Sequence, residues 1–303
     1  SSVPSGVLGI ANTSGVYTYY SDFATANAAA SSGDTIELFS DITESGAVTV
    51  TLKDGVKYNF NGHTYTCSDS AAQIAFAFAT GTVYLFNGKI LRTGGNTSSE
   101  ALDVTSTGTV IGNNFQVEND NGKAATCNGG TLRNIDFINA GSGVCVQVDA
   151  NGRIENCKAY STTNFGIYVN DGIGVDCYGF STVNYGISGG TGELINCTGE
   201  SAGSAGLQTA TVNQNCKGYS TGGSGIRIRA NGDVLYNCSA YSIANHGIDN
   251  SGGKRFSMYN STTHSTTNYG INNVAISNGG DFVWSNSSFT SDASFGILAT
   301  ISQ

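Results

Sequence analysis

The second half of the chain alternates apolar and polar residues in short runs that recur about every 20 residues. In residues 157–160 small or apolar side chains alternate with polar or large ones, as a half-buried strand requires. Gly166 then permits a sharp bend, and residues 167–169 form the next alternating run. The pattern predicts coils made of short strands separated by turns.

A twelve-residue unit repeats along this half, running from an Asn or Asp to a Gly-Ile or Gly-Leu pair. Ungapped copies begin at Asn156, Asp176, Asn196, Asn215, Asn237 and Asn260, a worn copy at Asn286 and a shortened one at Asn134. From Asn156 onwards, successive starts differ by 20, 20, 19, 22, 23 and 26 residues. This period is too short for helical-pair repeats or propeller blades, and the leucine-rich consensus is absent. What remains is one turn of a parallel β-helix.

Stacking such turns at about 4.8 Å places equivalent residues in columns. An inward aliphatic column would contain Ile167, Ile187, Leu207, Ile226, Ile248, Ile271 and Ile297. A second inward column would contain Cys157, Cys177, Cys197, Cys216 and Cys238, continued by Ser261 and Ser287. A third, at the turn, would contain Asn156, Asn196, Asn215, Asn237, Asn260 and Asn286, whose amides can bond to one another.

The first part of the chain is interpreted as the start of the same structure. Residues 22–30 predict a helix, with Ser21 as its N-cap and Gly33 beyond its end. Strands are expected at 35–39, 48–52, 56–60, 83–86, 102–104 and 110–115. A helix at this position would cover the open end of the solenoid. We therefore expect an N-terminal segment with a capping helix over 1–34, and one continuous β-helix of about 12 coils over 35–303.

The coil N-C-x-A/G-x-S…G-I and the opening FATANAAASSGDTIEL resemble the pectate-lyase-like superfamily of right-handed, single-stranded parallel β-helices. The resemblance covers nearly the whole chain and concerns its fold. Members include polysaccharide lyases and hydrolases, bacteriophage tailspikes and tail fibres, and bacterial surface adhesins. The resemblance thus implies an all-β solenoid, whereas the function must be argued from sites.

Composition narrows the partners of such a solenoid. Only 12% of residues are charged, so the surface must consist largely of Ser, Thr, Asn and Gly, which suits sugars or a stacked partner. The net charge of −9 argues against nucleic acid, whose phosphates require clustered Lys and Arg. No apolar run approaches the roughly 18 residues of a membrane span.

The eight cysteines predict packing rather than bridging. Five recur at an inward position, where serines replace them in two later coils, so we expect reduced, buried thiols. Cys67, Cys127 and Cys145 lie outside that column, and their state is left open. Cysteine spacings do not match zinc sites, and the three histidines stand apart, so no metal or other cofactor is expected.

An outward column is the first candidate binding face. It comprises Tyr160, Phe180, Glu200, Tyr219, Tyr241 and His264, with Tyr178 beside it. Aromatic rings on a polar face can stack on sugars. The favoured alternative is that they stack on each other across strands, or are buried in a symmetric oligomer.

The catalytic candidates are Asp171, Asp233 and Asp249 with Arg227 and Arg229, expected on or just after one strand face. A hydrolase would need two suitably spaced carboxylates, and a lyase a base and usually an acidic calcium site. Asp171 and Arg229 should lie two or three coils apart, roughly 10–15 Å by the strand spacing. We interpret these residues as solvated charges on the solenoid wall.

Three functions remain open. The favoured one is a structural or receptor-binding rod of a bacteriophage tail fibre or tailspike that contacts a host surface glycan, as a homotrimer or part of a larger virion or surface assembly. The alternatives are a secreted or virion-borne polysaccharide lyase or hydrolase, and a bacterial surface adhesin. Short coils leave little room for the insertions that usually build a substrate cleft. Since the chain starts at Ser1 and ends one strand after the last copy, it is expected to be a processed product or a segment of a longer protein.

Overall fold

The computed structural model describes residues 8–11, 14–46, 49–70, 74–273, 282–293 and, for the backbone only, 297–299. The fold is an all-β parallel solenoid of about 11 turns with 3% helix, close to the 12 coils expected. Two compact units divide it: unit 1 contains residues 1–147 and 152–158, and unit 2 contains 148–151 and 159–303. The single domain from residue 35 onward stays a prediction.

Unit 1 begins with antiparallel strands that the sequence did not reveal. Strand β1 (Leu8–Ala11) pairs antiparallel with both β2 (Tyr17–Tyr20) and β3 (Thr35–Leu38). Helix α1 (Phe23–Ala29) lies between β2 and β3 in the chain. Its N-cap is Asp22, whose Oδ1 accepts the Thr25 N–H at 2.7 Å, so the prediction of Ser21 was wrong. A carboxylate one residue closer reaches the free N–H groups of the first turn.

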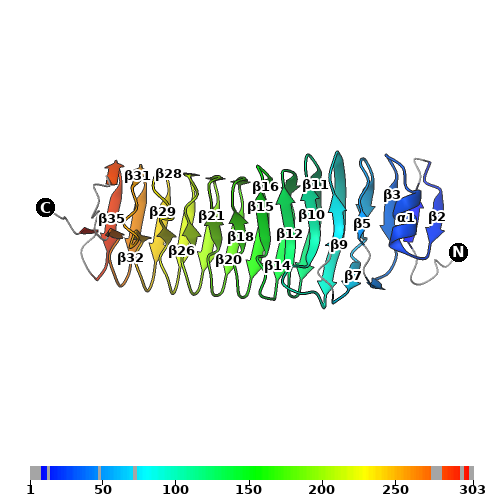
Figure 1. Cartoon of the computed structure of the whole chain (residues 1–303), viewed down its shortest axis with the longest axis horizontal. Coiled ribbons are helices and arrows are strands. Elements are labelled where there is room, and N and C mark those ends of the chain that lie inside the picture. The colour runs from blue at the N-terminus through cyan, green and yellow to red at the C-terminus, as the bar shows by residue number, and fades with distance from the viewer. Residues whose placement is uncertain are drawn as a thin grey trace. The chain divides into compact units, whose positions relative to one another are not determined.

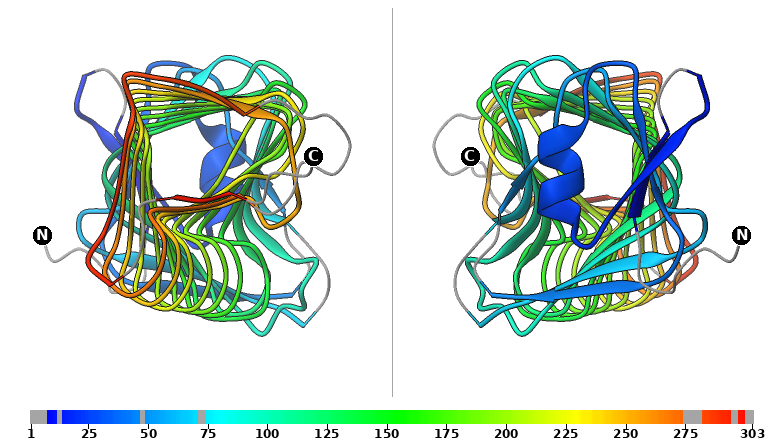
Figure 2. Two further views of the ribbon diagram at one scale, coloured as in Figure 1. Left: turned by 90° about the vertical axis from the view of Figure 1, so that its left-hand side faces the viewer. Right: turned by 90° about the vertical axis from the view of Figure 1, so that its right-hand side faces the viewer.

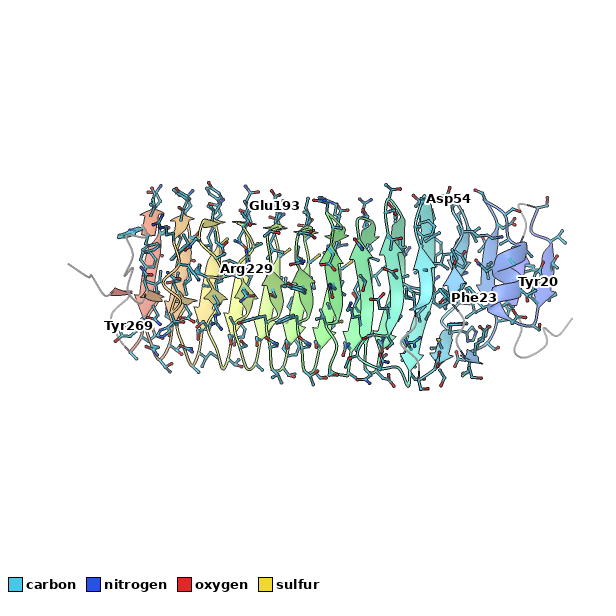
Figure 3. All side chains as sticks on the ribbon, viewed as in Figure 1. Tyr20, Phe23, Asp54, Glu193, Arg229 and Tyr269 are labelled. Atoms are coloured by element: carbon cyan, nitrogen blue, oxygen red, sulfur yellow. The ribbon has the colours of Figure 1, made fainter. Side chains whose placement is uncertain are left out.

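Helix α1 closes one end of the core of unit 1, as predicted. Phe23 is fully buried and meets Tyr65 and Phe76 edge-on, with ring centroids 5.1 and 5.2 Å away. It also stacks on Tyr58 at 6.0 Å. In the right-hand view of Figure 2 the helix lies across the end of the coils of unit 1, and Figure 3 labels Phe23. The helix thus shields the aromatic core from solvent at this end.

The coils of unit 1 follow in parallel register. Their strands are β4 (Ile42–Ser45), β5 (Val50–Thr51), β6 (Lys57–Asn59), β7 (Thr64–Ser68), β8 (Ile74–Phe78), β9 (Thr82–Thr93), β10 (Glu100–Thr105), β11 (Thr109–Asn119), β12 (Lys123–Asn128), β13 (Thr131–Arg133), β14 (Asp136–Asn139) and β16 (Arg153–Glu155). The predicted strands at 83–86, 102–104 and 110–115 fall within β9, β10 and β11. Those at 35–39, 48–52 and 56–60 extend beyond the ends of β3, β5 and β6, and Val48 lies outside the described residues. Large rings, among them Phe60, Tyr65, Phe76 and Phe137, fill the core.

In unit 2 each coil has three strands, and every row of strands pairs in parallel (Figure 1). First strands are β19 (Ile173–Val175), β22 (Glu193–Ile195), β25 (Val212–Gln214), β28 (Asp233–Tyr236), β31 (Phe256–Tyr259) and β34 (Phe282–Ser285). Second strands are β20 (Tyr178–Ser181), β23 (Thr198–Ser201), β26 (Lys217–Ser220), β29 (Ser239–Ser242), β32 (Thr262–Ser265) and β35 (Ser288–Ser291). Third strands are β18 (Ile167–Val169), β21 (Ile187–Gly189), β24 (Leu207–Gln208), β27 (Ile226–Arg227), β30 (Ile248–Asp249), β33 (Ile271–Asn273) and β36 (Ile297–Ala299). Strands β15 (Val146–Asp149) and β17 (Lys158–Ser161) have residues in both units.

The predicted inward columns are confirmed. Ile167, Ile187, Leu207, Ile226, Ile248 and Ile271 are at most 1% exposed, while the side chain of Ile297 lies outside the described residues. All eight cysteines are buried and free, which also settles Cys67, Cys127 and Cys145. Each column thiol donates to the carbonyl two residues earlier, for example Cys197 to Ile195 at 3.3 Å, and Ser261 donates to Tyr259 at 2.8 Å in the same way. Cysteine and serine are therefore interchangeable small donors at this position.

The asparagine column is a structural bend between first and second strands. Asn156, Asp176, Asn196, Asn215, Asn237, Asn260 and Asn286 all have φ between 48° and 55°, a left-handed conformation that Asn tolerates. Hydrogen bonds between side-chain amides join neighbouring coils: Asn215 donates to Asn196 at 3.0 Å, and Asn237 donates to Asn215 at 3.1 Å. The sequence missed that Asn61, Asn87 and Asn114 of unit 1 share this conformation. The bend therefore continues where the repeat is no longer visible.

Candidate functional site

The predicted aromatic face lies on the outward side of the second strands, but its rings cover one another. Tyr219 and Tyr241 stack at 5.5 Å with 7° between their planes, and His264 stacks on Tyr241 at 5.2 Å. Tyr241 is thus stacked on both faces, whereas Tyr219 and His264 each have one stacked face. This geometry supports cross-strand stacking rather than sugar stacking.

The other predicted members of this face, from Tyr160 to Glu200, are arranged less regularly. Tyr160 is 38% exposed and tilts against both Tyr178 and Phe180. The Tyr178 hydroxyl donates to Glu200 at 2.8 Å. Burial, followed by this hydrogen bond, raises the pKa of Tyr178, so the pair holds its proton on the phenol. These contacts hold the rings at tilted angles, and Tyr160 stays partly open to solvent.

The predicted catalytic residues do not converge. Asp233 is 1% exposed at the start of β28, where its carboxylate accepts the N–H of Ala230 at 2.9 Å and the hydroxyl of Thr209. Burial raises the pKa of Asp233. It closes a turn, so the prediction that it lies on the wall with the other candidates was wrong. Asp171 is exposed in the turn after β18, and Asp249 lies on β30, bonded to Ser251.

The two arginines extend back across two coils. Arg227 Nη1 donates to the Tyr185 hydroxyl at 2.9 Å, and Arg229 Nη2 donates to the Gly190 carbonyl at 2.9 Å. Figure 3 labels Arg229 on unit 2. Arg227 lies directly opposite Asp249 in the register of β27 and β30, yet among the described residues no ion pair joins them. Arg227 therefore keeps donors available beside a carboxylate.

A second aromatic column, which the sequence reasoning missed, contains a gap. The residue before each Gly-Ile or Gly-Leu pair is Phe165, Tyr185, Ala205, Ser224, His246 and Tyr269 in successive coils. Phe165 stacks on Tyr185 at 5.6 Å with 11° between planes, and His246 stacks on Tyr269 at 5.7 Å with 16°. Between these pairs Ala205 and Ser224 leave one ring face of Tyr185 and one of His246 without an aromatic neighbour.

This gap is a hollow of about 180 Å³, which we call the notch. It is lined by Gly203, Ser204, Ala205, Gly222, Gly223, Ser224, Arg227, Asn245 and Asp249. Tyr185 and His246 are three coils apart, about 14 Å by the strand spacing, and they flank the notch without belonging to its lining. Its outer edges carry a guanidinium, an amide and a carboxylate.

Buried serines hold the floor of the notch. Ser220 accepts the N–H of Gly223 at 2.8 Å and donates to the Ser204 carbonyl at 2.5 Å. Ser242 in turn donates to the Gly223 carbonyl at 2.7 Å. A side-chain carbon on Gly223 would lie 2.2 Å from the carbonyl oxygen of Ser204, so only glycine fits. The floor is thus built from fixed backbone, as a preorganised site requires.

His246 follows the lining residue Asn245 and is therefore next to the notch. Burial lowers its pKa, and the Asp249 carboxylate only partly opposes this. Its buried Nδ1 has no hydrogen-bond partner among the described residues. The imidazole therefore presents a neutral ring face near unused polar atoms. The signal in the sequence was the pair of small residues, Ala205 and Ser224, that interrupts an otherwise aromatic repeat position.

No protein-family model and no curated protein matches the chain. Among solved structures, ORF18 of Geobacillus virus E2 is similar over 87% of this chain and 55% of that one, with 10% identity and a TM-score of 0.35. The chain thus spans about half the length of that phage protein. A likeness of this size carries no argument about family or function, so membership of the pectate-lyase-like superfamily stays a hypothesis.

Two further observations concern the described residues alone. They include no helix that is both long and apolar enough to cross a membrane. They also contain no group of three or more His, Cys, Asp or Glu side chains arranged to hold a metal ion.

Proposed function

We propose that this protein is a non-catalytic β-helical binding module that holds a sugar ring of a surface glycan in the notch. The observation that carries the proposal is the interruption of the aromatic column between Tyr185 and His246, where a hollow of Gly, Ala and Ser also has Arg227, Asn245 and Asp249 in its lining. The favoured setting is a bacteriophage tail fibre or tailspike, in the virion and within a larger, trimeric assembly.

The chemistry of the notch favours a saccharide. The C–H face of a sugar ring packs on aromatic faces, while its hydroxyls need donors and acceptors at the rim. Arg227, Asn245 and Asp249 supply both, and their opposite charges suit a neutral ring. The net charge of −9 and the 12% share of charged residues in the sequence oppose a nucleic-acid ligand.

The enzyme alternative is less well supported. Asp233 is committed to its turn, and Asp171 lies after a strand three coils before β27. Asp249 therefore has no second carboxylate of the predicted set beside it. A surface adhesin would use the same notch, and the host assembly distinguishes it from a phage protein.

Filling the notch tests this function. Ser224→Tyr restores the aromatic column, so it should keep or raise stability while weakening glycan binding at least tenfold, measured on a glycan array and then by calorimetry with the best array ligand. Tyr219→Ala, on the face whose rings are mutually covered, is the matched control and should bind normally. Unchanged binding by Ser224→Tyr would refute the notch. Release of new reducing ends from the array ligand, lost in Asp249→Asn, would favour the enzyme instead.

A further inference from the structure

Unit 1 contains a larger hollow that is separate from the notch. It has a volume of about 500 Å³ and follows the bend in the coils of β7, β9, β11 and β14. Its bend side carries the amides of Asn87, Asn114 and Asn134. We call this hollow the groove.

The amide column is open in the groove. Asn114 Nδ2 and Asn87 Oδ1 are 3.5 Å apart, at the limit of a hydrogen bond. Where the column is closed in unit 1, Asn156 donates to Asn134 at 2.8 Å. In the groove the Asn87 and Asn114 amides are therefore joined only by a long hydrogen bond, and both side chains are exposed.

A second row of polar groups lines the groove along the adjoining strands. Thr64 pairs with Lys89, Lys89 with Gln116 and Gln116 with Asp136 in consecutive strands. The row thus offers a hydroxyl, an amide and a carboxylate at the repeat of the coils, together with the Lys89 ammonium, which is paired with Glu118 at 3.1 Å. Phe115 lies in the floor and is only 4% exposed, so the groove presents little apolar surface.

We infer that the groove is a second binding site, for an extended hydroxyl-rich chain such as an oligosaccharide lying along the coils. Sugar hydroxyls donate and accept at once, which matches two rows that each offer both kinds of atom. The ammonium of Lys89 opposes a metal cation, the carboxylate of Asp136 opposes an anion, and the buried Phe115 leaves nothing for an apolar ligand. Planar amides repeated at about 4.8 Å suit a ligand that is itself repetitive.

The site can be tested with glycine substitutions, because glycine adopts the left-handed bend without the amide. The side-chain amide signals of ¹⁵N-labelled full-length protein would be followed while cellohexaose, maltohexaose and mannohexaose are added. At least one of the three should shift the Asn87 and Asn114 signals. The double variant Asn87→Gly/Asn114→Gly should bind that probe roughly tenfold more weakly, as expected for two neutral hydrogen bonds.

Two controls separate this site from the notch and from folding. Asn237→Gly removes an amide from the closed column of unit 2 and should leave the affinity unchanged. Ser224→Tyr fills the notch and should leave the shifts of Asn87 and Asn114 intact, so either site can fail alone. The inference is overturned if none of the three probes shifts the groove amides at millimolar concentration, or if the double variant binds as tightly as the parent.

Discussion

Units 1 and 2 make the same bend with different cores. In unit 1 the coil from Asn61 to Asn87 contains 26 residues, and the coil from Asn87 to Asn114 contains 27. Between Asp176 and Asn260, coils of unit 2 contain 19 to 23. Both units keep an Asn or Asp with φ near 50° at the bend. The bend conformation thus recurs in coils of both units, whereas repetition of the core side chains is optional.

The two cores also distribute their packing differently. In unit 1 large rings pack against one another in the core. Phe76, for example, contacts both Phe23 and Tyr65 edge-on. In unit 2 columns of Ile, Cys and Ser recur from coil to coil, and Phe256 and Met258 are buried beside them in one coil. Loss of one ring should therefore cost much more stability than loss of one small side chain.

The largest expected effect breaks the core of unit 1. Phe76→Ala should lower the free energy of unfolding by about 3–5 kcal/mol, because the buried ring leaves a cavity between α1 and the coils. Cys197→Ala in unit 2 is the matched change and should cost about 1 kcal/mol. Urea denaturation gives both values, and hydrogen exchange resolved by segment locates the loosened coils. Equal losses for the two variants would contradict the contrast.

A smaller effect tests the shared bend. Asn215→Ala places a side chain without an amide in the left-handed conformation and should cost about 1–2 kcal/mol in urea unfolding. Asn215→Gly keeps the conformation and loses only the side-chain hydrogen bonds to Asn196 and Asn237, so it should lower the free energy of unfolding by less. If glycine lowers the free energy of unfolding as much as alanine does, the side-chain hydrogen bonds and not the backbone conformation determine the stability of the bend.

The smallest effect sharpens the electrostatic side of unit 1. Burial, and then the nearby Glu100 carboxylate, raise the pKa of Asp103 to about 6. The folded state therefore holds this proton more tightly than the unfolded chain, so stability falls as the pH rises from the ordinary pKa of 3.8 through about 6. Asp103→Asn should stabilise by about 1 kcal/mol at pH 8, after allowance for solvent screening, and the gain should vanish near pH 4.

Thermal unfolding across this pH range measures the gain. Asp171→Asn, an exposed change in unit 2, should leave stability within about 0.5 kcal/mol at both pH values. A pH-independent gain from Asp103→Asn would show that packing, rather than charge, is responsible.

Register explains how much of the fold could be predicted. The twelve-residue copies placed Cys197, Ile187 and Asn215 correctly, because each position in a coil has one fixed side. The same bend at Asn61 and Asn87 was missed, since the aromatic core of unit 1 had erased the surrounding repeat. Both carry the turn signal Asn-Gly, which could have revealed them.

The candidate sites were harder to predict than the fold. Periodicity places Tyr219 and Tyr241 outside but does not say whether their faces are free, which depends on ring angles. Asp233 was misplaced because one coil contains three more residues than its predecessor, 22 rather than 19, and folds that carboxylate into its turn. In the sequence the notch corresponds only to an absence of rings at positions 205 and 224, and small residues at a repeat position form no motif that points to a site.

The notch shows that a recess on this scaffold needs no inserted loop. Two small side chains in an aromatic column are enough, because the rings of the neighbouring coils flank the recess and the backbone forms its floor. A lineage of such proteins could therefore move, widen or close a ligand site by single-codon changes at one repeat position, with the scaffold untouched. Ligand specificity would then evolve by changes at equivalent positions of successive coils, at a spacing set by the strands.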